Sequence, residues 1–162
     1  SRDIARFTEL GVIASMQPIH STADMRFVEP RIGAERAKGA YAWRSLMNSG
    51  AVLAFGSDWP VETLDPMAGI HAAVTRQDDK HDPPNGWQPQ ERITVAEAMR
   101  AYTGAAAYAA FWEDEMGKVE QGKLADFTVL SQNLFSIPPD QILRTKVLVT
   151  VVGGEVVYRA SV

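Results

Sequence analysis

Cysteine is absent from the 162 residues of this sequence. Its absence excludes disulfide bonds, zinc sites built from thiolates, and catalysis by a cysteine nucleophile. Any bound metal ion would therefore have to be held by histidine, aspartate or glutamate side chains, and the sequence contains 3 histidines.

Long apolar runs and an excess of basic charge are also missing. No apolar stretch approaches the roughly 20 residues that span a bilayer. Residues 1–6 are not a cationic region followed by an apolar one, as a signal peptide would be. The formal net charge is -4, and no basic stripe interrupts the mixture of signs. We therefore expect a cytoplasmic protein with neither nucleic acid nor a membrane as its partner.

The composition that is present, 46% hydrophobic and 22% charged, is typical of a soluble globular domain with a core. Up to residue 116 the pattern alternates between helical and strand-like segments. Helical spacing over 4–10 and 35–48 precedes two short apolar runs, 12–16 and 51–55. The strand–helix–strand order predicts a parallel pair, buried on both faces, in an α/β fold.

Local signals mark further elements of the first 116 residues. Asp65-Pro66 is typical of a helix N-cap followed by proline at the first helical position, and predicts a helix to about residue 76. Thr94 to Glu97 forms a capping box before an alanine-rich helix, with a break expected at Thr103-Gly104. Residues 77–91 have no periodicity and predict a loop that covers its neighbours.

Strands predominate after Gly117. The apolar segments 126–130, 147–152 and 155–159 are predicted strands, and a short helix is expected over 140–144. Gly153-Gly154 joins the last two strands in the manner of a two-residue hairpin, because glycine tolerates positive φ. The change of pattern divides the chain into residues 1–116 and residues 117–162.

Three stretches together resemble one protein family: ASMQPIH at 14–20, LAFGSDWPV at 53–61 and GKLADFTVL at 122–130. They look like the amidohydrolase superfamily, and more narrowly the amidohydrolase-3 group that includes N-substituted formamide deformylase-like enzymes. The three stretches occur in the family's order, and a closing VGGEVVY hairpin follows them.

The resemblance implies a metal-dependent hydrolase with a TIM-like (β/α)8 barrel and a small β-sandwich built from both chain ends. Residues 1–116 would be the C-terminal segment of the barrel, with 12–16 and 51–55 as its seventh and eighth strands, and residues 117–162 would belong to the sandwich. A full barrel needs about 250 residues. The family's His-x-His pair, mid-barrel Lys or Glu and two later His ligands have no counterpart here, so we expect an incomplete chain that is inactive in isolation.

Asp58 is the strongest candidate for a catalytic residue. It follows the C-terminal end of a predicted parallel strand, where barrel enzymes place their catalytic groups. The resemblance implies that Asp58 is both a metal ligand and the base that takes a proton from metal-bound water, with zinc as the expected divalent metal. The alternative is an aspartate that caps the turn after the strand.

His20 follows the other predicted strand at the equivalent end. In a parallel pair it would face the same side as Asp58, where it could hydrogen-bond a substrate carbonyl or join the metal shell. The alternative is a partly exposed loop histidine near Thr22 and Asp24.

Other side chains are weaker candidates. Gln17 and Trp59 are candidate substrate-binding residues of a pocket wall, although an aromatic residue in a loop more often packs. His71, in a helical stretch, and His81, in an Asp-rich loop, are interpreted as structural and solvated residues respectively. Asp126 is interpreted as a structural residue at the turn into a strand.

Two hypotheses of function follow. In the first, the parent protein hydrolyses a non-peptide C–N bond of a small-molecule amide, formamide or cyclic amide through a metal-activated water. In the second, the chain is a non-catalytic module that forms a homo-oligomer by pairing its open strands with another copy, which would satisfy their unpaired backbone groups.

Overall fold

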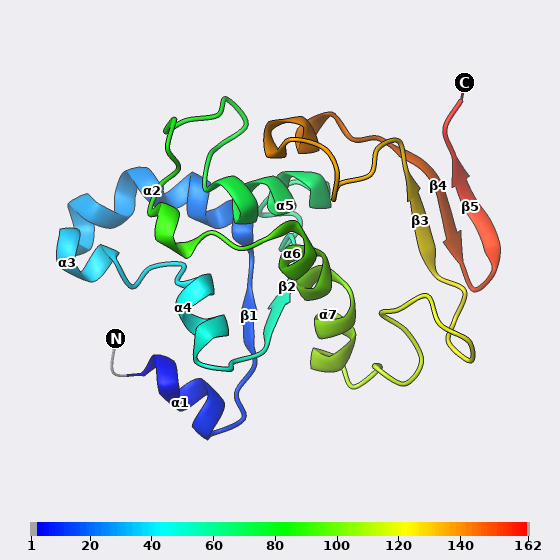
Figure 1. Ribbon diagram of the computed structural model, residues 1–162, viewed down its shortest axis with the longest axis horizontal. Coiled ribbons are helices and arrows are strands. Elements are labelled where there is room, and N and C mark those ends of the chain that lie inside the picture. Colours follow the sequence, from blue (N-terminus) through cyan, green and yellow to red (C-terminus); the bar gives the residue numbers. More distant parts are fainter. Residues whose placement is uncertain (1–2, 162) are drawn as a thin grey trace.

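The computed structural model describes residues 3–161, with helices around a pair of parallel strands and a three-stranded antiparallel sheet at the far end of the molecule (Figure 1). The elements in chain order are α1 (Ile4–Glu9), β1 (Ala14–Met16), α2 (Pro18–Ile32), α3 (Ala34–Ala37), α4 (Trp43–Asn48), β2 (Leu53–Phe55), α5 (Pro66–Thr75), η1 (Pro89–Glu91), α6 (Val95–Tyr102), α7 (Gly104–Ala109), β3 (Phe127–Leu130), η2 (Pro139–Arg144), β4 (Val147–Val152) and β5 (Glu155–Arg159). The predicted mixed α/β class is confirmed.

The two strands of the first sheet are parallel, as predicted. Met16 lies opposite Phe55, and the Gly56 amide donates to the Met16 carbonyl at 3.2 Å just beyond the paired residues. All three residues of β2 are buried. Because the strands are parallel, the segments that leave their carboxyl ends emerge on the same side, beside α2 and α5 (Figure 1).

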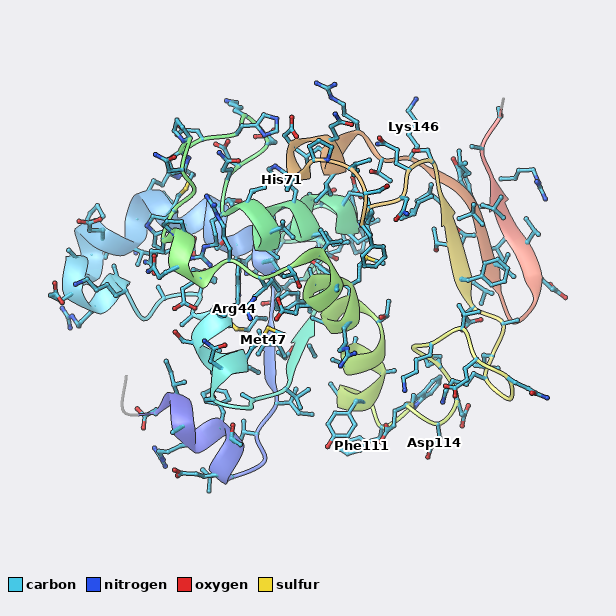
Figure 2. All side chains as sticks on the ribbon, viewed as in Figure 1. Arg44, Met47, His71, Phe111, Asp114 and Lys146 are labelled. Carbon is cyan, nitrogen blue, oxygen red and sulfur yellow. The ribbon has the colours of Figure 1, made fainter. Side chains whose placement is uncertain are left out.

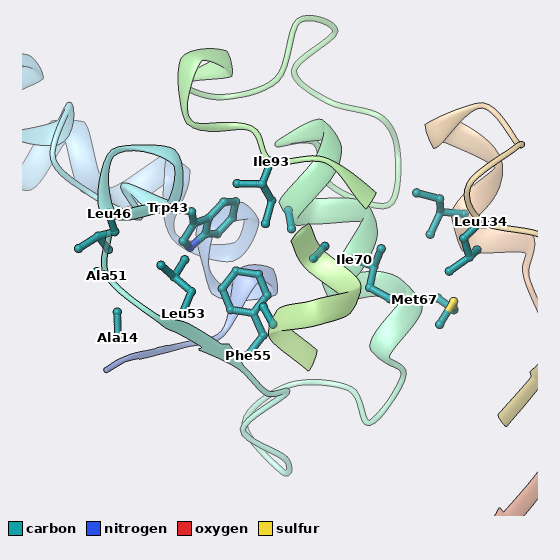
Figure 3. Packing of buried hydrophobic residues seen from close by; sticks show 14 residues of the cluster. Ala14, Trp43, Leu46, Ala51, Leu53, Phe55, Met67, Ile70, Ile93 and Leu134 are labelled. Atoms are coloured by element: carbon teal, nitrogen blue, oxygen red, sulfur yellow. The ribbon is translucent and has the colours of Figure 1, made fainter. Parts of the chain in front are cut away.

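The core lies between β2 and the helices α4, α5 and α6 (Figure 3). The Trp43 ring meets the Phe55 ring edge-on at 6.0 Å, and Phe55 meets Tyr102 at 5.6 Å. A Cβ atom at Gly69 would lie 1.8 Å from the Tyr102 hydroxyl oxygen, so only glycine allows α5 to approach α6 this closely.

The local helix signals are confirmed. The Asp65 carboxylate accepts a hydrogen bond from the Met67 amide at 2.9 Å and caps α5. Thr94 and Glu97 form both hydrogen bonds of the capping box at the start of α6. The predicted break falls at Thr103, between α6 and α7.

The single helix predicted over 35–48 is wrong. The structure has α3 and α4 instead, with Tyr41 at φ 52° between them. The Tyr41 carbonyl accepts a hydrogen bond from Arg76 Nη1 at 2.9 Å, and its hydroxyl donates to Asp24 at 2.5 Å. These long-range contacts hold the backbone in a conformation that the apolar spacing of the segment does not reveal.

The antiparallel sheet has the strand order β3-β4-β5, and the predicted hairpin is confirmed. Gly153 and Gly154 have φ angles of 57° and 85°. Asp126 accepts a hydrogen bond from the Gly153 amide at 2.6 Å, in agreement with its interpretation as a structural residue. Every residue of β5 is exposed.

Chain segments after β3 return to the helical part of the molecule. Leu134 and Ile142 are buried members of the main core cluster, and η2 packs on α5. Of the loop predicted over 77–91, residues 77–88 are irregular, and the last three residues form the 3-10 helix η1. Across residues 3–161, none of the helices is both long and apolar enough to cross a membrane.

Candidate functional site

The segments that leave the parallel strands bring two predicted site residues together. His20 lies in the first turn of α2, directly after β1, and Asp58 is the third residue beyond β2. The Nε2 atom of His20 is 3.9 Å from Oδ2 of Asp58. Parallel pairing of β1 and β2 is what places both side chains at the same edge of the sheet.

A partly exposed loop histidine is the alternative interpretation of His20 from the sequence, and the structure corrects the loop position. His20 lies in α2, and its side chain is 22% exposed. Nε2 itself is buried and has no hydrogen-bond partner within residues 3–161. The 3.9 Å separation from Asp58 is longer than a hydrogen bond, whose heavy atoms lie about 2.7–3.2 Å apart. This ring nitrogen therefore has no competing hydrogen bond from the described residues.

Asp58 is held at φ 55°, a left-handed conformation that is uncommon for residues other than glycine. Its carbonyl oxygen accepts a hydrogen bond from the Val61 amide at 2.8 Å, which closes the turn. Its side chain is 52% exposed, and over the described residues the carboxylate accepts no hydrogen bond. The carboxylate therefore does not cap this turn, contrary to the structural alternative.

Gln17 and Trp59 lie next to the pair in the sequence. Gln17 is the half-buried N-cap residue of α2, but its side chain makes no capping hydrogen bond. Trp59 is 62% exposed. In the part of the chain that is described, no hydrogen bond or ring contact joins either side chain to His20 or Asp58, so their role as pocket walls stays a prediction.

The geometry of His20 and Asp58 can be tested against a metal ion. Two atoms that bind one zinc ion at about 2.0–2.2 Å each lie no more than about 4.4 Å apart. The separation of 3.9 Å meets this condition, and both atoms lack competing hydrogen bonds from residues 3–161. Among those same residues, no group of three or more His, Asp or Glu side chains is placed to hold a metal ion. The pair therefore fits a metal as two of its ligands.

Sequence reasoning missed the contact between the histidines His71 and His81. His71 on α5 (Figure 2) is 1% exposed. Its ring meets that of His81 edge-on, with centroids 5.3 Å apart. Burial is the main cause that lowers the pKa of His71, followed by the neighbouring His81. From the sequence, His71 and His81 are interpreted separately, whereas the structure joins them through a ring contact between α5 and the irregular loop that follows it.

Comparison with known proteins identifies the family. The Amidohydrolase family model matches residues 1–158. Protein LONG AFTER FAR-RED 3 of Arabidopsis thaliana is 42% identical over 154 residues, which cover 94% of this chain and 26% of that protein. N-substituted formamide deformylase of Arthrobacter pascens is 31% identical over 118 residues, or 73% of this chain and 21% of that enzyme.

A solved structure shows the same fold. An uncharacterized metal-dependent hydrolase from Pyrococcus horikoshii OT3 matches 86% of this chain and 28% of its own chain, with a TM-score of 0.74 and 28% identity. The chain belongs to the amidohydrolase family, which confirms the resemblance seen in its motifs. It spans 21% and 26% of the length of the two curated relatives.

Proposed function

We propose that this chain forms part of a metal-dependent hydrolase that cleaves a carbon–nitrogen bond other than a peptide bond in a small amide, formamide or cyclic amide. Family membership and the similarity to a formamide deformylase support the reaction class. The observation that carries the proposal is the approach of Asp58 to His20 at the carboxyl end of a parallel strand pair.

Within this proposal, β1 and β2 are the seventh and eighth strands of a (β/α)8 barrel, and residues 117–162 belong to a β-sandwich. The parallel register and the complete burial of β2 support the barrel assignment. Catalytic residues of such barrels come from the loops at the carboxyl ends of the strands, where His20 and Asp58 lie.

Asp58 would bind the metal and take a proton from the attacking water, because its carboxylate is free of protein hydrogen bonds within residues 3–161. Nε2 of His20 would bind the substrate carbonyl oxygen or join the metal shell, and Gln17 and Trp59 would border the substrate. When bound, zinc polarises a carbonyl and lowers the pKa of coordinated water to about 7. Catalytic zinc sites typically use three protein ligands, so at least one further ligand would come from beyond the described residues.

The activity test uses the protein at the full length of its relatives, with an N-alkylformamide as substrate. Asp58→Ala should lower kcat by at least about 10²-fold, because general-base catalysis typically contributes that much. Asp114→Asn, which removes a carboxylate exposed on another part of the molecule, should leave kcat unchanged. Hydrolysis by Asp58→Ala at the rate of the unsubstituted enzyme would contradict the assignment.

Zinc content of the 162-residue chain tests the metal role separately from turnover. Elemental analysis after dialysis should show less zinc per chain in Asp58→Ala than in the unsubstituted chain, with Asp114→Asn retaining the original amount. Equal and near-stoichiometric zinc in all three proteins would mean that Asp58 is not a ligand. No zinc in any of them would mean that this chain carries only one part of the metal site, whose function belongs to the longer protein.

A second function is supported by a different feature. Every residue of β5 is exposed, including Val156, Val157 and Tyr158, and β5 forms one edge of its sheet. Exposed apolar edges pair readily with other strands. A non-catalytic module that forms a homo-oligomer through this edge is therefore the alternative to an enzyme fragment.

A further inference from the structure

A recess of about 370 Å³ lies between α2, the β2–α5 loop, α5, η2 and the beginning of the 77–88 segment. Residues of very different character line it. Ile19 and Leu143 contribute apolar surface, while Glu62, Asp78 and Asp79 contribute carboxylates.

The side chains that line this recess carry net negative charge. Within residues 3–161, its lining includes three carboxylate side chains and no Lys or Arg. A further carboxylate, that of Asp140 on η2, lies close enough to His71 for its negative charge to raise the pKa of that histidine, against the larger effect of burial. Carboxylates that line a recess raise the local concentration of cations.

His71 supplies a buried polar group on the wall of the same recess. Its side chain is 1% exposed, and its Nε2 atom has no hydrogen-bond partner among residues 3–161. A buried polar atom without a partner destabilises the folded state, because it has lost its hydrogen bonds to water. Burial lowers the pKa of His71, so the imidazole is neutral at pH 7 and has one donor and one acceptor nitrogen. A ligand that forms this missing hydrogen bond would remove this destabilisation.

The recess suits an organic cation better than a bare metal ion. In the described part of the chain, no three His, Asp or Glu side chains are placed to coordinate one ion. The volume of about 370 Å³ also exceeds what an ion requires, and Ile19, Ala68, Ala72 and Leu143 give it apolar walls. A short alkyl chain would cover these walls while its charged end meets the carboxylates.

We propose that this recess binds a protonated primary amine carried on a short alkyl chain, with Glu62 and Asp79 neutralising the ammonium group and His71 as a hydrogen-bond partner. Ile19 immediately precedes His20, and Glu62 follows Asp58 by four residues, so the recess adjoins the candidate active site. An amine bound there need not be hydrolysed, and its binding is independent of the proposed hydrolase activity.

The test is a titration of the ¹⁵N-labelled 162-residue chain with n-propylammonium at pH 7.5, followed by NMR. We expect saturable shifts at His71 and at residues 78–79. Glu62→Gln combined with Asp79→Asn should weaken binding about 5- to 30-fold, because two ion pairs with the ammonium group are lost. Asp78 is left unchanged because its carboxylate accepts hydrogen bonds from the Lys80 and Asp82 amides.

Two controls separate a built site from general attraction to an acidic protein. Asp114→Asn with Glu115→Gln removes the same charge elsewhere and should leave the affinity for n-propylammonium unchanged. Propan-1-ol, which has a similar shape and no charge, should give no saturable shift. Equal loss of affinity in both double variants, or equal binding of propan-1-ol, would overturn the proposal. Because Asp58 and His20 are unchanged throughout, the result does not depend on the metal role of either residue.

Discussion

Arg76 is a fully buried cation that joins the irregular segment to the core. It donates hydrogen bonds from Nε to the Trp87 carbonyl at 2.8 Å and from Nη1 to the Tyr41 carbonyl at 2.9 Å. Its guanidinium carbon lies 4.3 Å from the ring centroid of Trp43 and 5.0 Å from that of Trp87. Burial lowers the pKa of Arg76 to about 10, so it remains charged at neutral pH.

Removal of this side chain should destabilise the protein strongly. Arg76→Ala loses both hydrogen bonds and both ring contacts, and we expect a decrease of about 3 kcal/mol in the free energy of unfolding, measured with urea. Arg100→Ala, at an exposed position of α6, should change it by less than about 0.5 kcal/mol. Similar values for the two variants would show that the buried guanidinium does not stabilise the fold.

Replacement of His71 should not destabilise the protein, in contrast to Arg76→Ala. The Nε2 atom of His71 has no partner among the described residues, so it destabilises the folded state when no ligand is bound. His71→Phe replaces the imidazole by an apolar ring and should maintain or raise the midpoint of thermal unfolding, while the n-propylammonium shifts become weaker. A lower midpoint would indicate that Nε2 has a partner in solution or that phenylalanine does not fit.

At the scale of elements, the start of α6 carries a carboxylate with several partners. Glu97 accepts hydrogen bonds from both guanidinium ends of Arg44, at 2.7 and 2.5 Å, and from the amide and hydroxyl of Thr94. The bonds from Arg44 are the main cause that lowers the pKa of Glu97 from 4.5 to about 2. The arrangement joins α4 to the capping box of α6.

This lowered pKa makes the stability dependent on pH. The folded state favours ionised Glu97, so the contribution is complete above the unfolded pKa of about 4.5 and is lost as the pH falls towards 2. Glu97→Gln should lower the free energy of unfolding by about 1–2 kcal/mol at pH 7. Urea unfolding from pH 7 to pH 3 should show this difference shrinking, while Glu120→Gln, at an exposed site, should show none.

The elements that could be predicted are those whose signals lie within a few residues. Asp65-Pro66, the capping box and Gly153-Gly154 each determine a local conformation through their own hydrogen bonds or φ angles. Helix α2 was not predicted, because it is largely polar, carries Pro30 within it and has few buried residues. The break at Tyr41 depends on Arg76 and Asp24, which are distant in the sequence.

Contacts in the candidate sites also differ in whether the sequence could predict them. The convergence of His20 and Asp58 could be predicted, since parallel strands place their carboxyl ends together. The contact of His71 with His81 could not, because it depends on how an irregular loop folds over α5. The role of Asp58 as metal ligand and general base depends on the family resemblance and stays a proposal.

At the scale of the whole molecule, the exposed edge of β5 predicts self-association. Val157→Lys places a charge at this edge, where Val157 is 60% exposed, and should shift the chain towards monomer in light scattering coupled to size-exclusion chromatography. Val119→Lys, at a position that is 85% exposed and outside the sheet, should leave the distribution unchanged. A monomeric unsubstituted chain would contradict association through β5.

The burial of Trp43 gives the molecule an optical reporter. Trp43 is completely shielded from water, whereas Trp59 and Trp112 are 62% and 51% exposed. With phenylalanine at positions 59 and 112, the fluorescence that remains comes from Trp43 and Trp87, the two rings on which Arg76 stacks. The emission of such a variant would follow the departure of the 77–88 segment from the core, without an attached dye.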